Sequence, residues 1–139
     1  ISSEVITRLN KQGQTLQIVS RNSSGELNWE KRYAYRGGKL LKSAQLDADG
    51  KPAVISSYTH NKWGQIVTEL ALDQQGDTVH TVYHRYNDKH AEVLRTFKST
   101  QIRASNSNRF FYNAAGLVRR NEIIEDQHLL EAIEYNYYP

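Results

Sequence analysis

Residues 58–86, YTHNKWGQIVTELALDQQGDTVHTVYHRY, combine two glycine turns with the alternating pattern of strands. Gly64 and Gly76 stand 12 residues apart, and each closes a short polar cluster. In the segment between them, residues 65–72, the apolar side chains fall mainly on alternate positions. This period of two is typical of a strand with one face more buried than the other. We therefore predict three consecutive strands joined by two glycine turns.

The same glycine spacing continues along the chain. Glycines recur every 12 to 14 residues from position 13 to position 76, and one more follows at 116. Residues 87–90 and 104–108 stand near the two missing places, and both contain Asn, which tolerates a left-handed backbone. One further step past Gly116 reaches residues 126–128. The pattern predicts about ten turns and ten or eleven strands, because glycine adopts positive φ without a steric cost.

Aromatic residues reveal a longer period of about 25 residues, which is typical of repeat proteins. They cluster just before alternate turns, and the approximate unit is Tyr-x-Tyr-Asn-x-x-Gly-x-Leu/Val. The copies are Tyr33-Ala34-Tyr35, Tyr58-Thr59-His60-Asn61, Tyr83-His84-Arg85-Tyr86-Asn87, Phe110-Phe111-Tyr112-Asn113 and Tyr135-Asn136-Tyr137.

Consecutive strands joined by short turns are antiparallel neighbours, so we predict an all-β antiparallel meander within one domain, residues 1–139. The repeat favours an open twisted sheet, and a closed up-and-down β-barrel is the alternative. Residues 99–108 interrupt the pattern and are interpreted as an extended loop or a bulged edge strand. Residues 129–133 fit a helical turn, but their position in the glycine spacing favours a strand.

The aromatic units resemble those of the YD/RHS hairpin-repeat family. The resemblance covers residues 31–139, with Asn or a basic residue near the place of the family's Tyr-Asp pair. It implies a bacterial surface, secreted or toxin-associated scaffold whose sheet wraps or binds another polypeptide. It implies no catalytic residues.

The amino-acid composition excludes several kinds of site and argues against others. The chain contains no cysteine, which excludes disulfides and thiolate metal sites, and we expect no metal or cofactor. No apolar run approaches the roughly 20 residues that cross a bilayer, so we expect no membrane span. Residues 1–43 hold eight Lys or Arg and three Glu, yet no nucleic-acid motif accompanies this charge. We therefore expect no nucleic-acid partner and interpret the charge as a solvated face.

Histidines and carboxylates give little sign of catalysis. His80 and His84 share one strand face, but four residues of a strand span about 13 Å, too far for one metal ion. His84 is expected to form a polar cluster with Glu69 or Arg95 on neighbouring strands. The aspartates at predicted turns are interpreted as structural, because such side chains bond their own backbone.

The aromatic side chains are the strongest candidates for a binding surface, because Tyr and Trp dominate interface hot spots. The alternative is that they stack as cross-strand pairs and stabilise the sheet. Trp63 is the best single candidate, because a side chain within a turn is expected to be partly exposed. The predicted partner-binding residues are Trp63, Trp29, Tyr33, Tyr35, Tyr58, Tyr83, Tyr86 and Tyr112.

The favoured hypothesis is a non-enzymatic bacterial β-repeat protein that binds another protein or the remainder of a larger polypeptide, as an envelope, immunity-like or toxin-shell scaffold. We expect a periplasmic or extracellular location, and edge-to-edge homodimers are a further expectation. The first alternative is a small β-barrel that carries an apolar ligand in its lumen. The second is an enzyme that uses His84 and nearby acids.

Overall fold

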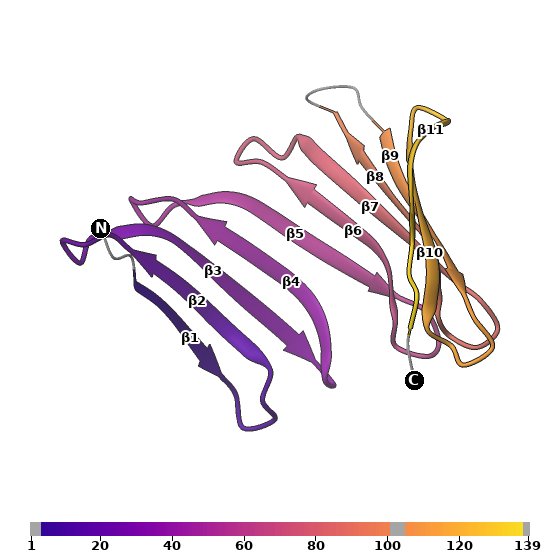
Figure 1. Cartoon of the computed structure of the whole chain (residues 1–139). Helices are drawn as coiled ribbons and strands as arrows, with labels where there is room; N and C mark the ends of the chain where they lie inside the picture. Colours follow the sequence, from indigo (N-terminus) through magenta and orange to yellow (C-terminus); the bar gives the residue numbers. More distant parts are fainter. Residues whose placement is uncertain (1–3, 101–104, 138–139) are drawn as a thin grey trace. The chain divides into compact units, whose positions relative to one another are not determined.

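The computed structural model describes residues 4–100 and 105–137, and this part of the chain is all-β (Figure 1). It contains eleven strands and no helix. The strands are β1 (Glu4–Leu9), β2 (Thr15–Arg21), β3 (Leu27–Arg36), β4 (Lys39–Leu46), β5 (Pro52–His60), β6 (Ile66–Leu72), β7 (Thr78–Tyr86), β8 (Glu92–Ser99), β9 (Ser105–Tyr112), β10 (Val118–Glu125) and β11 (His128–Glu134).

The strands form one antiparallel sheet in which the spatial order is the sequence order, from β1 to β11. This confirms the predicted meander and its strand number. Within the described residues β1 and β11 are the two edges of the sheet and do not pair with each other, so the sheet is not closed. The alternative of a closed barrel is therefore wrong, because closure requires the first and last strands to hydrogen-bond.

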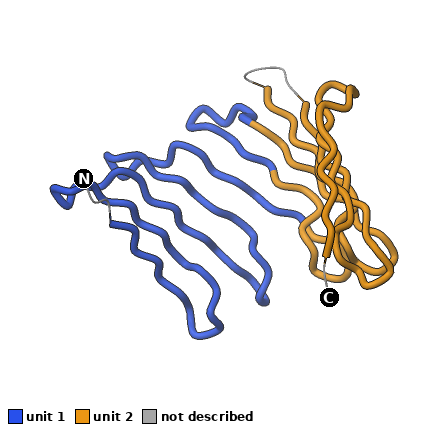
Figure 2. Tube along the Cα trace, in the orientation of Figure 1, with its two compact units in different colours: residues 1–59, 70–79 blue, residues 60–69, 80–139 orange. Residues whose placement is uncertain are grey.

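Contacts along the chain gather into two compact units, shown in Figure 2. The first unit comprises Ile1–Thr59 and Leu70–Val79, and the second comprises His60–Glu69 and His80–Pro139. The prediction of one domain over residues 1–139 stays a prediction.

Most turns share one hydrogen-bonded design that begins with Asn or Asp. In the turn after β6, the Asp73 Oδ1 atom accepts hydrogen bonds from the backbone N–H groups of Gln75 and Asp77, both at 2.9 Å. The Gly76 N–H donates to the Asp73 carbonyl, and Gly76 has φ of 87°. A type I turn followed by a left-handed residue matches the twist of a hairpin. The first residues of these turns are Asn10, Asn22, Asp47, Asn61, Asp73, Asn87 and Asn113.

Three further sequence predictions concern residues 87–90, 99–108 and 129–133. His90 takes the glycine position of the turn that begins at Asn87, with φ of 62°, as the glycine spacing indicated. Residues 128–134 form β11, so the strand interpretation of 129–133 is confirmed. The predicted irregular segment 99–108 is wrong at both ends, because β8 reaches Ser99 and β9 begins at Ser105. Its central residues, 101–104, lie outside the described residues.

The sheet has very little buried apolar surface of its own. Among the described residues, the buried hydrophobic side chains are Val19, Leu46 and Ala71. Small polar residues occupy other buried positions, as with Ser43, whose Oγ lies 3.0 Å from the Tyr58 hydroxyl. No large side chain of the described residues is fully buried. Local turns and strand pairing therefore define this fold, and no covering layer of the described chain packs on the sheet.

The shared turn design predicts that Asp73→Ala destabilises the protein by about 1–2 kcal/mol, because two backbone N–H groups lose their acceptor. Urea unfolding followed by circular dichroism measures the change. Asp77→Ala is the matched control, because it keeps both of these hydrogen bonds. Equal stabilities for the two variants would show that the side-chain acceptor contributes nothing.

Candidate functional site

Four tyrosines connect consecutive hairpins through their hydroxyl groups. Each hydroxyl donates to a backbone carbonyl on the preceding strand, 19 or 20 residues earlier. The bonds are Tyr35 to Thr15 at 2.9 Å, Tyr86 to Ile66 at 2.7 Å, Tyr112 to Glu92 at 2.5 Å and Tyr137 to Val118 at 2.8 Å. Tyr86 and Tyr112 directly precede the Asn that opens a turn, so the repeated aromatic unit encodes these contacts.

These hydroxyl bonds connect the strands, and a role of the repeat tyrosines in binding a partner stays a prediction. The tyrosines were candidates either for stacking in cross-strand pairs or for binding a partner. The ring pairs found among the described residues are Trp63 with His90 and His80 with Phe97, so the repeat tyrosines do not form stacked pairs there. The rings of Tyr35, Tyr86 and Tyr112 are half-buried, and Tyr137 is exposed. Their hydroxyls bond the carbonyls of the residues that begin β2, β6, β8 and β10.

Glutamine side chains link neighbouring turns in a second way. Asn61 Nδ2 donates to Gln65 Oε1 at 3.0 Å, and Gln65 Nε2 donates to the His90 carbonyl at 2.7 Å. In the first unit, Gln14 makes the equivalent bond to the Gly38 carbonyl at 2.8 Å. Two amides therefore position the His90 turn against the turn that carries Trp63.

Trp63 and His90 meet at these two turns and form the most exposed aromatic contact of the second unit. Their ring centroids lie 4.5 Å apart, and the Lys62 ammonium lies 4.3 Å from the Trp63 ring centroid. Trp63 is 59% exposed, which confirms the expectation for a turn residue. A hollow of about 470 Å³ lies beside them, and Tyr86 and His84 also contribute to its wall.

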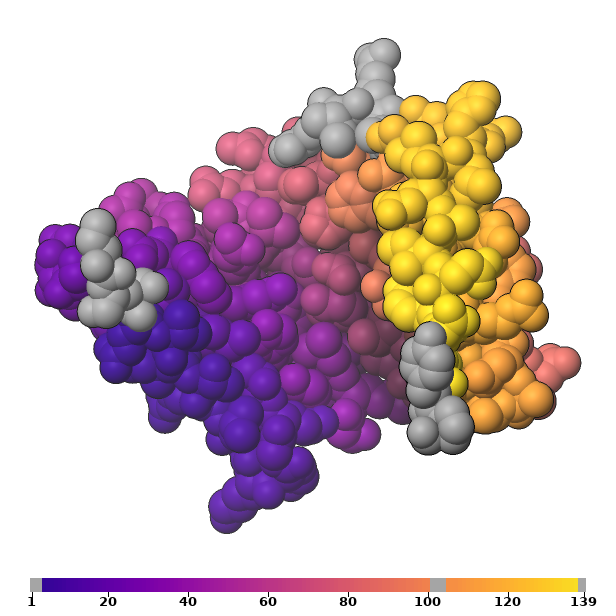
Figure 3. Space-filling view, viewed as in Figure 1, coloured from indigo at the N-terminus to yellow at the C-terminus, as the bar shows by residue number. Residues whose placement is uncertain are grey.

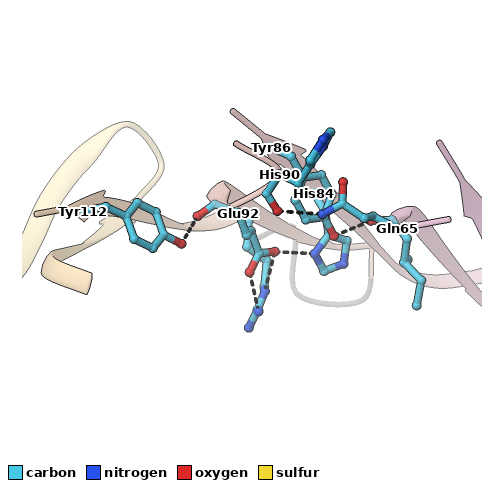
Figure 4. A network of polar contacts seen from close by, with 8 residues as sticks. Gln65, His84, Tyr86, His90, Glu92 and Tyr112 are labelled. Carbon is cyan, nitrogen blue, oxygen red and sulfur yellow. Dashed lines mark hydrogen bonds and ion pairs between the residues drawn. The ribbon is translucent and has the colours of Figure 1, made fainter. Parts of the chain in front are cut away.

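An ion-pair network lies next to this hollow (Figure 4). The Glu92 carboxylate accepts from His84 Nδ1 at 2.5 Å and from the Arg95 guanidinium at 2.7 and 3.2 Å. Glu92 also supplies the backbone carbonyl that receives the Tyr112 hydroxyl. The predicted partners of His84 were Glu69 or Arg95. Arg95 lies opposite His84 in the register of β7 and β8, and Glu92 bridges the two side chains. Glu69 instead lies 3.6 Å from His80.

The charges of this network shift the pKa values of its members. Burial raises the pKa of the Glu92 carboxyl, but hydrogen bonds from Arg95 and His84 outweigh burial and hold it below its usual range. Burial, followed by the negative charge of Glu92, raises the pKa values of the Tyr86 and Tyr112 hydroxyls. Glu92 is therefore a carboxylate near neutral pH and accepts the Nδ1–H of His84.

The network favours a structural role over a catalytic one. A carboxylate that orients an imidazole is part of many general-base sites. Here the same carboxylate is also engaged by two nitrogen atoms of Arg95, and that pairing is typical of a stable ion pair. Within the described residues, no cluster of three or more His, Asp or Glu side chains is arranged to hold a metal ion.

The structure separates the predicted binding residues into several places. In the second unit, Trp63 and Tyr86 flank one hollow, and Tyr112 lines a second one beyond the Asn87–His90 turn. Tyr83 is 44% exposed and lies under the Lys98 ammonium. Trp29, Tyr33 and Tyr58 belong to the first unit, where Tyr33 borders a hollow between Arg8 and Arg32, Trp29 is 37% exposed and Tyr58 bonds Ser43.

Sequence reasoning missed His90 and Glu92 as members of the candidate site. The repeat contains a signal that could have found His90, because it occupies the position of Gly64 one repeat later. Glu92 lies at the start of a strand, and only the cross-strand register brings it to His84. No local pattern marks that position.

Comparisons with known proteins give a likeness of fold alone. No protein-family model matches the sequence, and no curated protein matches it. A porin-like protein from Bacteroides uniformis is 18% identical, with a TM-score of 0.55 over 89% of this chain and 48% of that chain. The chain therefore spans about half the length of that protein.

Two further solved structures align with lower similarity. One is the GtfA/B complex bound to UDP and GlcNAc, which is 19% identical with a TM-score of 0.28, over 84% of this chain and 22% of that chain. The other is a Bacteroides fragilis protein of unknown function, 12% identical with a TM-score of 0.27, over 96% of this chain and 92% of that chain. Similarity at this level carries no functional argument.

Tyr86→Phe should destabilise the protein by about 0.5–1.5 kcal/mol, because the Ile66 carbonyl loses its donor while the ring remains. Urea unfolding measures the difference. Tyr83→Phe is the matched control, because it removes a hydroxyl from an exposed ring on the same strand. The structural role of the hydroxyl is refuted if the two variants unfold alike.

Glu92→Gln should lower the stability at neutral pH by roughly 1–2 kcal/mol, because the Arg95 guanidinium is then left without its counter-charge. The folded pKa of Glu92 lies below its unfolded value, so the carboxylate stabilises the fold above the unfolded pKa. That stabilisation is lost as the pH falls through the folded pKa. Stability measured against pH should therefore fall less steeply in acid for Glu92→Gln. Glu131→Gln, on the exposed strand β11, should keep the wild-type slope.

Proposed function

We propose that this chain is a non-enzymatic β-repeat protein that binds another polypeptide. The observation that carries the proposal is the uncovered apolar surface of the sheet. Large hydrophobic side chains stay 37–61% exposed on both units, and three buried hydrophobic residues form the whole apolar core of the described chain. Exposed apolar surface of this kind marks interaction sites, because a sheet normally buries one face against another layer.

The turn edge of the second unit is the centre of the proposed surface. Trp63 presents a large aromatic ring that two bonded turns hold in place, so little conformational entropy is lost when a partner covers it. His90 and Lys62 flank the ring, and the neighbouring hollow accepts a protruding side chain. A rigid aromatic anchor beside a shallow hollow is typical of an interface hot spot.

The lack of enzymatic activity is part of this proposal. The titratable side chains beside the hollow are engaged with one another, as in the bridge from His84 through Glu92 to Arg95. The carrier alternative requires a lumen, and the open sheet of the described residues does not enclose one. No helix among the described residues is long and apolar enough to cross a bilayer.

The resemblance to YD/RHS hairpin repeats supports the cellular location and the kind of partner that we propose. In that setting the chain is a bacterial scaffold in the periplasm or outside the cell, acting as an envelope, immunity-like or toxin-shell component. Its partner is another protein or the remainder of a larger polypeptide. The tyrosine bonds at a spacing of about 26 residues support the repeat character on which the resemblance rests.

A capture experiment tests the proposed surface. Immobilised wild-type chain is exposed to an extract of its source, and bound proteins are identified by mass spectrometry. We expect a partner that the wild type retains and that Trp63→Ala loses by at least about tenfold, the effect of removing a hot spot. Trp29→Ala, which removes an exposed Trp from the first unit, should retain it. A partner held equally by all three chains would overturn the assignment of Trp63.

A further inference from the structure

Within the described residues, strand β11 is an edge of the sheet, and no strand pairs with its outer side. The Tyr135 N–H donates to the Arg119 carbonyl at 2.9 Å, so Tyr135 faces β10. In an antiparallel pair, hydrogen bonding alternates between neighbouring residues. Ile133 therefore faces β10 as well, whereas the N–H and C=O groups of Ala132 and Glu134 point outward. Figure 3 shows the side chains of β11, in yellow, uncovered at the surface of the second unit.

This edge lacks several of the features that normally prevent strand addition, although a register shift interrupts its pairing with β10 at Ile123/Ile124. Edge strands are usually short or carry lysine, proline or a covering loop. β11 has seven residues, none of them lysine, arginine or proline, and six of the seven are exposed. Leu129 and Leu130 are 55% and 61% exposed. The edge is thus suited to pairing with another strand.

The charge of the C-terminal region determines which kind of added strand pairs favourably with β11. Residues 121–139 contain five acidic side chains and no Lys or Arg. Glu131 and Glu134 lie on β11 itself, with side chains on opposite faces of the strand. Glu134 is paired with Arg120 of β10 at 3.1 Å, whereas Glu131 forms no ion pair with the described residues. Like charges across a strand pair are destabilising, so two copies of β11 disfavour each other. A strand that places lysine or arginine opposite Glu131 is complementary. The other edge strand, β1, carries one Glu and one Arg and selects neither sign.

The tyrosine hydroxyl bonds of the repeat continue at Tyr137, just after the end of β11. The Tyr137 hydroxyl bonds the Val118 carbonyl at 2.8 Å, as Tyr86 and Tyr112 do with their acceptors. In those two earlier repeats, the tyrosine is followed by a hairpin whose next strand pairs antiparallel. The outer edge of β11 therefore corresponds to the edges of β7 and β9 on which the next antiparallel strand pairs.

We propose that β11 binds an extended, basic strand of the partner polypeptide in antiparallel orientation. This inference rests on the proposed function and names the partner's chemistry. Backbone hydrogen bonds to Ala132 and Glu134 supply the affinity, as in other cases of strand addition. Pairing of lysine or arginine with Glu131 supplies the preference for a basic strand.

A synthetic peptide provides the probe. Residues 36–46 of this chain, RGGKLLKSAQL, contain three basic and no acidic side chains, and they span the end of β3, a glycine turn and strand β4. With the peptide bound, we expect the amide hydrogen exchange of Ala132 and Glu134 to slow by at least about tenfold, while β1 is unaffected. A peptide with Lys39→Glu and Lys42→Glu should bind at least about tenfold more weakly.

A substitution on the outer side of β11 completes the test. Ala132→Pro removes an outward N–H and keeps the bonds to β10, so the variant should fold but lose the peptide. Ala132→Val keeps the N–H and should bind like the wild type, and circular dichroism verifies the fold of both variants. The proposal is overturned if no peptide binds, if protection appears on β1, or if reversing the peptide charge or introducing proline has no effect.

The two proposals fail separately. If the captured partner is retained by Ala132→Pro but lost by Trp63→Ala, the protein-binding function stands and the β11 site is wrong. If both variants retain the partner while a third surface is protected, neither site is the interface. If Ala132→Pro loses the partner and Ala132→Val retains it fully, the contact is assigned to the outer backbone of β11.

Discussion

The turn that begins with Asn or Asp is the constraint on which the rest of the structure depends. One side-chain oxygen satisfies the N–H group four residues later, and a left-handed residue lies in between, so both the loop length and the register of the following strand are determined. Seven turns of this kind place successive strands beside one another without help from a buried core. The left-handed residue is glycine in six of these turns and His90 in the seventh.

Tyrosine hydroxyls then connect the hairpins to one another. Each bond runs from the strand end before one turn to a carbonyl just after the previous turn on the same edge, as from Tyr112 to Glu92. Such nearest-neighbour contacts suit a repeat sheet, because every hairpin is stabilised by adjacent ones. They also explain how a sheet with three buried hydrophobic residues keeps its order while much apolar surface stays exposed. That exposed surface is the basis of the proposed binding function.

The candidate site shows how the repeat is diversified locally. In one repeat, His90 takes the place of the turn glycine. Trp63 lies on the neighbouring turn, and its ring contacts the ring of His90. The exposure of Trp63 was predictable, because a bulky side chain within a four-residue turn has no strand face to bury it. The contact with His90 was not predictable, since it depends on the distance between two residues that are 27 positions apart in the sequence. The bridge from His84 to Glu92 likewise depends on cross-strand register.

The sequence by itself determined the all-β class, the antiparallel meander, the number of strands and the place of most turns. Glycine and Asn positions encode local backbone conformation, and local conformation is readable without knowing what packs where. The tertiary structure alone decided that the sheet stays open, because closure depends on twist summed over many strands. It also decided that Ser105–Asn108 belong to β9, and that the repeat tyrosines donate hydrogen bonds in place of stacking. These properties depend on contacts between strands, and the residues on one strand do not specify them.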